Sequence, residues 1–219
     1  YGETVDYSTY EKQIRNMVNK YIGADQVKII IDQTDVFDEG NFEKEIENIQ
    51  GEAAKADTIA SRVKRTISER MEEDPALYKK LSELIEEAIL AHREKRLSDA
   101  DYLTRVKTVL DEMRGKNKKD YPKQIRNNDE AKAYFGVLKE YLSIDDESAV
   151  ADYSLKIFEV IERHKIRDWV NNRDVQNKMS VEIDDLLYAL KGKYTLSITS
   201  EQMDEIIETL LMIARRRDS

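Results

Sequence analysis

The sequence predicts an all-α fold, an irregular bundle of eight or nine helices with at most one short strand. First, the 219 residues include only 7 glycines and 2 prolines, whereas a β-sandwich or barrel needs a turn about every 8–12 residues. Second, apolar residues recur along the chain at spacings of three and four, the period of an amphipathic helix. Third, 40% of the residues are hydrophobic and 37% are charged, which fits long helices that carry charge on their outer faces.

The N-terminal segment contains one predicted helix and the chain's best strand candidate. The helix extends from Tyr7 to Ile22, and Gly23 then ends it. Residues 27–31 are β-branched and short, but one strand needs a partner to form a sheet. Residues 32–47 hold seven acids and one lysine, a candidate steering patch for a basic partner. A short helix in this region is expected to carry Phe42, Ile46 and Ile49.

Three longer helices are expected between residues 59 and 113. Asp74 is a suitable N-cap and Pro75 suits the first helical position, so a new helix begins there. Ser98 and Asp101 resemble a capping box with Asp in place of Glu. The expected buried positions of these helices are Ile59, Ala60, Val63, Ile67, Met71, Leu77, Leu81, Leu84, Ile85, Ala88, Ile89, Leu103, Val106, Val109, Leu110 and Met113.

Residues 114–126 interrupt the helical pattern with six bases, one acid, Gly115 and Pro122. This segment is the best internal boundary, with a helical lobe at 1–113, a connecting loop at 114–127 and a second lobe at 128–219, or one domain overall. A solvated loop is the favoured interpretation of its charge. The alternative is contact with DNA phosphates through Lys116, Lys118, Lys119, Lys123 and Arg126.

The apolar spacing in residues 128–219 predicts four more helices. One covers Ala131 to Leu142, and the next begins near Asp146 and ends near Trp169, an expected packing anchor. Asn171 and Asn172 form a turn and cap before a third helix. The last helix starts with a capping box, Thr199 and Gln202, and ends in three arginines.

The sequence predicts no catalytic, cofactor-binding or metal site. The chain has no cysteine, and neither Gly115 nor Gly192 has the partner glycines of a phosphate-binding loop. The two histidines, His92 and His164, are too far apart for a zinc-binding helix. Asp184–Asp185 could hold Mg²⁺, but an exposed helix face is the better interpretation. Glu130 and Lys132 match half of a nuclease motif that normally lies on strands, whereas this segment is helical.

Three stretches together resemble a known family. They are Tyr21–Asp25, Asp74–Glu83 and Asp168–Tyr188, and the last contains the most specific block, Asp-Trp followed by Val-Gln, Met and Ile-Asp-Asp. The chain is similar over nearly its whole length to the C-terminal helical region of the restriction (R) subunit of type I restriction-modification enzymes.

The resemblance implies a non-catalytic domain of an ATP-dependent, site-specific deoxyribonuclease subunit. In this family the endonuclease and the ATP-driven DNA motor lie upstream, so ATP and Mg²⁺ are expected on those absent domains and no cofactor is expected here. The implied partners are the methyltransferase (M) and specificity (S) subunits, with DNA reached through the complex. The matching residues with structural roles are Asp74, Pro75, Leu81 and Trp169. Asp184 and Asp185 match as helix-face acids.

The remaining expectations concern the location of the protein and other functions. The net charge of −9 and the lack of an apolar run of about 20 residues favour a cytoplasmic protein without a membrane span. The chain begins at Tyr1 rather than Met, so we expect a piece of a longer or processed protein. The alternatives are a stand-alone helical nucleic-acid-binding module and a scaffold or adaptor domain of another ATPase.

Overall fold

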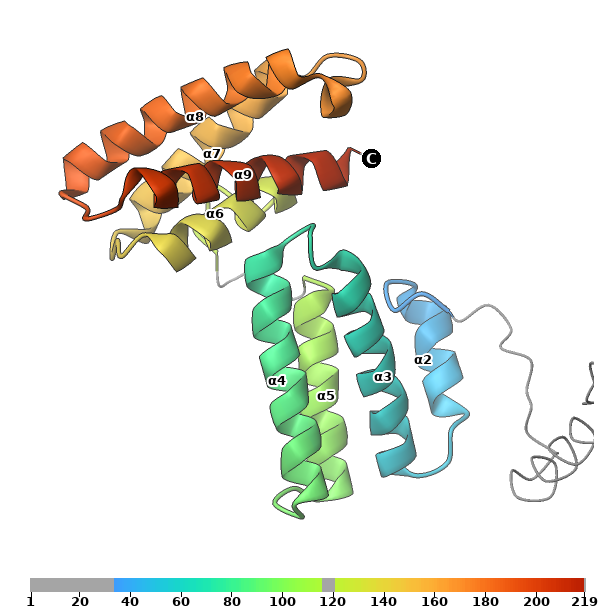
Figure 1. The fold of residues 1–219 in the computed structure, drawn as a ribbon. Helices are drawn as coiled ribbons and strands as arrows, with labels where there is room; N and C mark the ends of the chain where they lie inside the picture. The colour runs from blue at the N-terminus through green and yellow to red at the C-terminus, as the bar shows by residue number, and fades with distance from the viewer. Residues whose placement is uncertain (1–33, 116–120, 219) are drawn as a thin grey trace, which may run out of the picture. The chain divides into compact units, whose positions relative to one another are not determined.

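The computed structural model describes residues 34–115 and 121–218, and every regular element in these ranges is helical (Figure 1). The all-α prediction is confirmed for this part of the chain. The helix expected from Tyr7 to Ile22 and the strand candidate at 27–31 lie outside the described residues. The α-helices are α2 (Glu39–Glu47), α3 (Glu52–Arg70), α4 (Pro75–Arg93), α5 (Asp99–Met113), α6 (Asp129–Tyr141), α7 (Glu147–His164), α8 (Arg173–Tyr194) and α9 (Ser200–Arg217).

Helices α2 to α5 enclose one cluster of buried side chains. Helices α3, α4 and α5 pack against one another, and α2 packs on α3 (Figure 1). Leu81 has no exposed surface, and Tyr78, which the helical pattern of α4 did not single out, is also buried. The cluster consists of Val36, Phe42, Ile46, Ala56, Ile59, Ala60, Val63, Ile67, Tyr78, Leu81, Ile85, Ala88, Tyr102, Val106, Val109, Leu110 and Met113.

Helices α6 to α9 enclose a second cluster of buried side chains. Helix α6 packs on α7 and α9, and α8 packs on α7 and α9. The apolar stripes of α8 and α9 that the sequence predicts face this core, among them Met179, Ile183, Leu187, Ile206 and Leu210. The division of the chain into lobes at residues 114–127 stays a prediction. In the described ranges, each helix is too short or too polar to cross a membrane.

The predicted helix starts are formed by side chains that bind free backbone N–H groups. Asp146 and Asn172 cap α7 and α8. At α9 the capping box is confirmed, because Thr199 Oγ1 accepts from Gln202 N at 3.2 Å and Gln202 Oε1 accepts from Thr199 N at 2.9 Å.

The start of α5 differs from the expected capping box. Ser98 accepts a hydrogen bond from the N–H of Asp101, as expected, but the Asp101 carboxylate accepts from the Ser98 hydroxyl at 2.6 Å. Aspartate is one methylene shorter than the glutamate of a full capping box, and this explains why it binds the nearer hydroxyl.

Helix α7 ends at His164, earlier than the expected end near Trp169. The residues after it supply Ile166 as their only apolar side chain before Trp169, and Ile166 is 55% exposed, so the buried face stops. Asp168 then adopts a left-handed backbone (φ 62°), and a short 3-10 helix follows at Trp169–Asn171.

Candidate functional site

The start of α4 places Asp74 in a buried position. Asp74 Oδ1 accepts a hydrogen bond from the N–H of Leu77 at 3.1 Å, and Pro75 is the first helical residue. Burial disfavours the charged carboxylate and raises the pKa of Asp74 to about 6, although the Leu77 N–H and the cations Arg217 and Lys132 act in the opposite direction. Asp74 therefore changes charge near pH 6.

Helices α4 and α6 approach closely beside this cap. A Cβ added at Gly136 of α6 would lie 2.7 Å from the Cβ of Ala76 and 3.8 Å from Asp74 Oδ1. Glycine at 136 is therefore what allows the backbones of α4 and α6 to come this near. Sequence reasoning did not single out Gly136, although an isolated glycine inside a helical pattern often has a packing reason.

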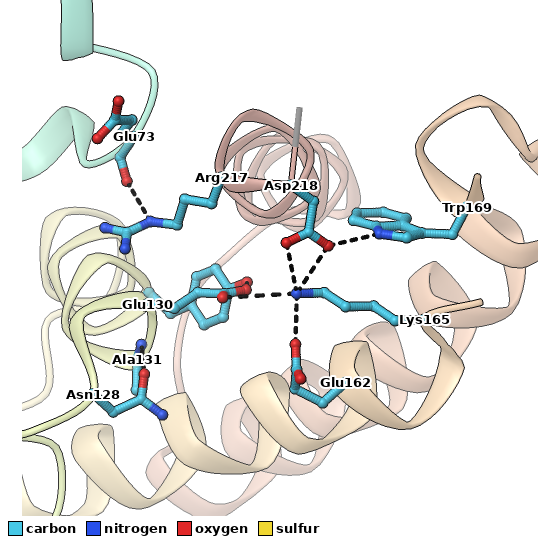
Figure 2. A network of polar contacts seen from close by, with 10 residues as sticks. Glu73, Asn128, Glu130, Ala131, Glu162, Lys165, Trp169, Arg217 and Asp218 are labelled. Carbon is cyan, nitrogen blue, oxygen red and sulfur yellow. Dashed lines mark hydrogen bonds and ion pairs between the residues drawn. The ribbon is translucent and has the colours of Figure 1, made fainter. Parts of the chain in front are cut away.

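The C-terminal end of α9 binds one backbone carbonyl in the last turn of α3 and one in the turn between α3 and α4. Arg217 Nε donates to the carbonyl of Glu73 at 3.2 Å (Figure 2), and Arg216 Nη2 donates to the carbonyl of Glu69 at 3.5 Å. The last carbonyls of a helix lack partners within the helix. Arg216 supplies such a partner to the Glu69 carbonyl, and Arg217 binds the turn that follows α3, so the two arginines join α9 to the end of α3 and to the α3–α4 turn.

Lys165 lies at the centre of a polar network that includes Trp169 (Figure 2). Its Nζ is 2.5 Å from Glu162 Oε1, 3.1 Å from Asp218 Oδ2 and 3.8 Å from Glu130 Oε2. Trp169, which is 4% exposed, donates its Nε1–H to Asp218 Oδ2 at 2.8 Å. Burial lowers the pKa of Lys165, but these carboxylates outweigh it and the pKa is raised. Lys165 therefore stays charged and holds the end of α9 against the segment after α7.

Glu130 and Lys132 have different partners. Glu130 accepts a hydrogen bond from the hydroxyl of buried Tyr134, and burial together with the Glu130 charge raises the pKa of Tyr134. Lys132 Nζ lies 2.6 Å from Asp129 Oδ1 and 5.6 Å from the Tyr121 ring centroid. Residues two apart on a helix do not face each other, so these two side chains do not converge as a nuclease motif requires.

The structure describes part of the basic segment. Arg126 Nε donates to the carbonyl of Tyr121 at 2.8 Å, which closes the loop before α6. Lys123 is exposed. The other proposed phosphate contacts, Lys116, Lys118 and Lys119, lie outside the described residues.

Each histidine is paired with one carboxylate. His92 Nε2 is 2.8 Å from Asp99 Oδ1, and its ring stacks on Tyr102 with centroids 4.4 Å apart. His164 Nε2 is 2.6 Å from Glu182 Oε1. The hydrogen bond from His164 is the largest influence that lowers the pKa of Glu182. These contacts join neighbouring segments of the fold.

Acidic side chains that the sequence singles out lie in two different settings. Glu45 and Glu43 of the 32–47 segment form ion pairs within the chain. Glu45 Oε1 lies 2.6 Å from Arg62 Nη2, and Glu43 Oε1 lies 3.7 Å from Arg114 Nη1. Asp184 and Asp185 are exposed on α8. Within the described ranges, no group of three or more His, Cys, Asp or Glu residues is placed to hold a metal ion.

Comparison with known proteins gives one family match. The sequence model of the family "Type I restriction enzyme HindI endonuclease subunit-like, C-terminal" matches residues 2–216. No curated protein and no solved structure matches the chain significantly.

Proposed function

Because the chain belongs to the family of C-terminal regions of type I restriction enzyme HindI endonuclease subunit-like proteins, we propose that it is a non-catalytic helical domain that joins its parent subunit to the restriction complex. Its partners in this proposal are the methyltransferase (M) and specificity (S) subunits. The family match over residues 2–216 is the observation that carries the proposal. ATP-dependent DNA translocation and cleavage are assigned to other domains of the parent.

The chemistry of the described side chains supports a docking role. Three ionisable residues near α4, α6 and α9 have partners within the fold: Asp74 caps α4, Asp218 accepts a hydrogen bond from Trp169, and Arg217 donates to the carbonyl of Glu73. A chain with a net charge of −9 is attracted to basic protein surfaces, and such attraction favours the encounter of specific partners. Family membership favours a restriction subunit over a scaffold of another ATPase.

Removal of the domain from the parent subunit tests this proposal. The intact parent should co-elute with purified M and S subunits in size-exclusion chromatography, whereas a parent without residues 1–219 should elute separately and still hydrolyse ATP. Undiminished co-elution of the shortened parent would overturn the docking role. ATP hydrolysis or DNA cleavage by the purified chain in Mg²⁺ would overturn its non-catalytic assignment.

A second proposed role is contact with DNA phosphates through the basic segment. The observation in its favour is the excess of six bases over one acid at residues 114–126, with Lys123 exposed. Changing Lys116, Lys118, Lys119 and Lys123 to Glu in the parent should weaken DNA binding. It should also make the slope of log binding constant against log salt concentration less negative, by about 0.9 for each phosphate contact that is lost.

Two exposed lysines on other helices provide the control for this experiment. Lys107 of α5 and Lys156 of α7 are both exposed, and their replacement by Glu should leave DNA affinity and its salt dependence nearly unchanged. If reversal of the basic segment also leaves both quantities unchanged, the segment does not bind DNA.

A further inference from the structure

Helix α8 exposes two large apolar side chains on one stripe. Val181 is 63% exposed and Tyr188 is 70% exposed. They are seven residues apart, which is about two helical turns, so both project from the same side of the helix. This side is opposite the stripe of Met179, Ile183 and Leu187, which is buried in the core.

Two carboxylates lie between these apolar residues. Asp184 and Asp185 follow Val181 by three and four residues, so they belong to the same face of α8. Both are exposed, and the structure gives neither of them a hydrogen bond or an ion pair within the described ranges. By contrast, Glu182, on the flank of this face, is paired with Arg163 and His164 of α7. The face thus combines exposed apolar surface with negative charge that has no partner inside the chain.

Gly192 continues the same stripe one turn beyond Tyr188. A glycine inside a helix costs about 1 kcal/mol relative to alanine, and a packing contact often explains it. A Cβ added at Gly192 would meet nothing within 4 Å, so the described part of this chain provides no such contact. The close approach of another molecule at Gly192 would provide this contact.

We propose that the α8 face formed by Val181, Asp184, Asp185, Tyr188 and Gly192 docks an arginine-bearing, partly apolar surface of the methyltransferase or specificity subunits. This inference rests on the proposed function. Arginine fits because its planar guanidinium pairs with carboxylates through two hydrogen bonds and also stacks on an aromatic ring. Apolar partner atoms would cover Val181 and the face of Tyr188, which is the kind of residue enriched at interfaces.

The charge of the face argues against two other occupants. DNA would bring phosphates against Asp184 and Asp185, and like charges at close range repel. A symmetric contact between two copies of this chain would place the same carboxylates of both copies in one patch, with the same repulsion. A basic surface on a different subunit avoids both penalties.

Substitutions in the parent subunit test the face. Tyr188→Ala and Asp185→Lys should each weaken binding to purified M and S subunits by about tenfold or more, the effect of losing a central interface residue. Asp184→Asn with Asp185→Asn should weaken the binding less and flatten its dependence on salt concentration. Binding is measured by biolayer interferometry on immobilised M and S subunits at three salt concentrations.

Helix α4 provides matched controls, since Glu83 and Leu90 are an exposed acid and an exposed apolar residue seven positions apart. Glu83→Lys and Leu90→Ala should change the affinity by less than about twofold.

Wild-type affinity of both α8 variants, together with loss of binding on removal of residues 1–219, would overturn this inference and leave the proposed function standing. Full binding without residues 1–219 would overturn the proposed function itself. A dimer of the parent that Tyr188→Ala dissociates, seen by light scattering, would identify a second copy as the occupant and also overturn the inference.

Discussion

Replacement of Gly136 by alanine should destabilise the protein, although alanine is the better helix former. The new Cβ would lie 2.7 Å from the Cβ of Ala76, whereas carbon atoms in favourable contact are about 3.5–4.0 Å apart. Neither Cβ can rotate away, because each is fixed to its backbone, so α4 and α6 must separate by about 1 Å. The helix propensity gain is about 1 kcal/mol and overpacking costs about 1–3 kcal/mol. We therefore expect a net loss of about 1 kcal/mol.

A double-mutant cycle with Ala76→Gly isolates this contact. Ala76→Gly alone should cost about 1 kcal/mol through helix propensity. The double variant removes the clash and exchanges one glycine for another, so its free energy of unfolding should return to within about 0.5 kcal/mol of the wild type. The assay is urea unfolding followed by circular dichroism at 222 nm. Stabilisation of the single Gly136→Ala variant by about 1 kcal/mol, as propensity alone predicts, would refute the close approach of α4 and α6.

Three further predictions concern stability. Folding raises the pKa of Asp74 from 3.8 to about 6. Its favourable contribution to the free energy of unfolding is therefore complete below about pH 4 and is lost as the pH rises through 6, which lowers the free energy of unfolding by up to about 3 kcal/mol. Asp74→Asn keeps a capping oxygen but does not titrate, so its free energy of unfolding should rise relative to that of the wild type as the pH is raised over this range, measured by parallel urea unfolding. A difference in free energy that does not change with pH would contradict the burial of the charge. Trp169→Phe removes the hydrogen bond to Asp218 and should lower the free energy of unfolding by about 1–2 kcal/mol; an unchanged urea midpoint would count against that bond. Thr199→Ala removes the α9 cap and should cost about 1 kcal/mol, measured as a lower thermal midpoint, whereas Ser197→Ala, outside the cap, should have little effect.

The sequence predicts the features of this fold that depend on neighbouring residues. Asp74, Asn172 and Thr199 begin helices because their side chains bind N–H groups two or three residues further along the chain, and a short motif contains both partners. The buried faces of α8 and α9 follow from the helical period in the same way. Where the local pattern was incomplete, as at the end of α7, the predicted boundary was wrong by several residues.

The contacts between helices far apart in the sequence could not be predicted. Arg217 binds the carbonyl of Glu73, 144 residues away, and nothing in either local sequence indicates that pair. Asp218 joins Lys165 and Trp169 only because α9 returns past the end of α7. The unpaired state of Asp184 and Asp185 is equally a property of the packed structure, since a sequence rich in acids does not show which of them lack partners.

The most direct test of the docking role is binding of the purified 219-residue chain to M and S subunits. The chain, added at rising concentration to immobilised M and S subunits, should bind saturably and should displace the intact parent subunit. The signal should weaken as salt is added, because exposed charges are screened. Absence of saturable binding at concentrations at which the parent binds fully would contradict the account.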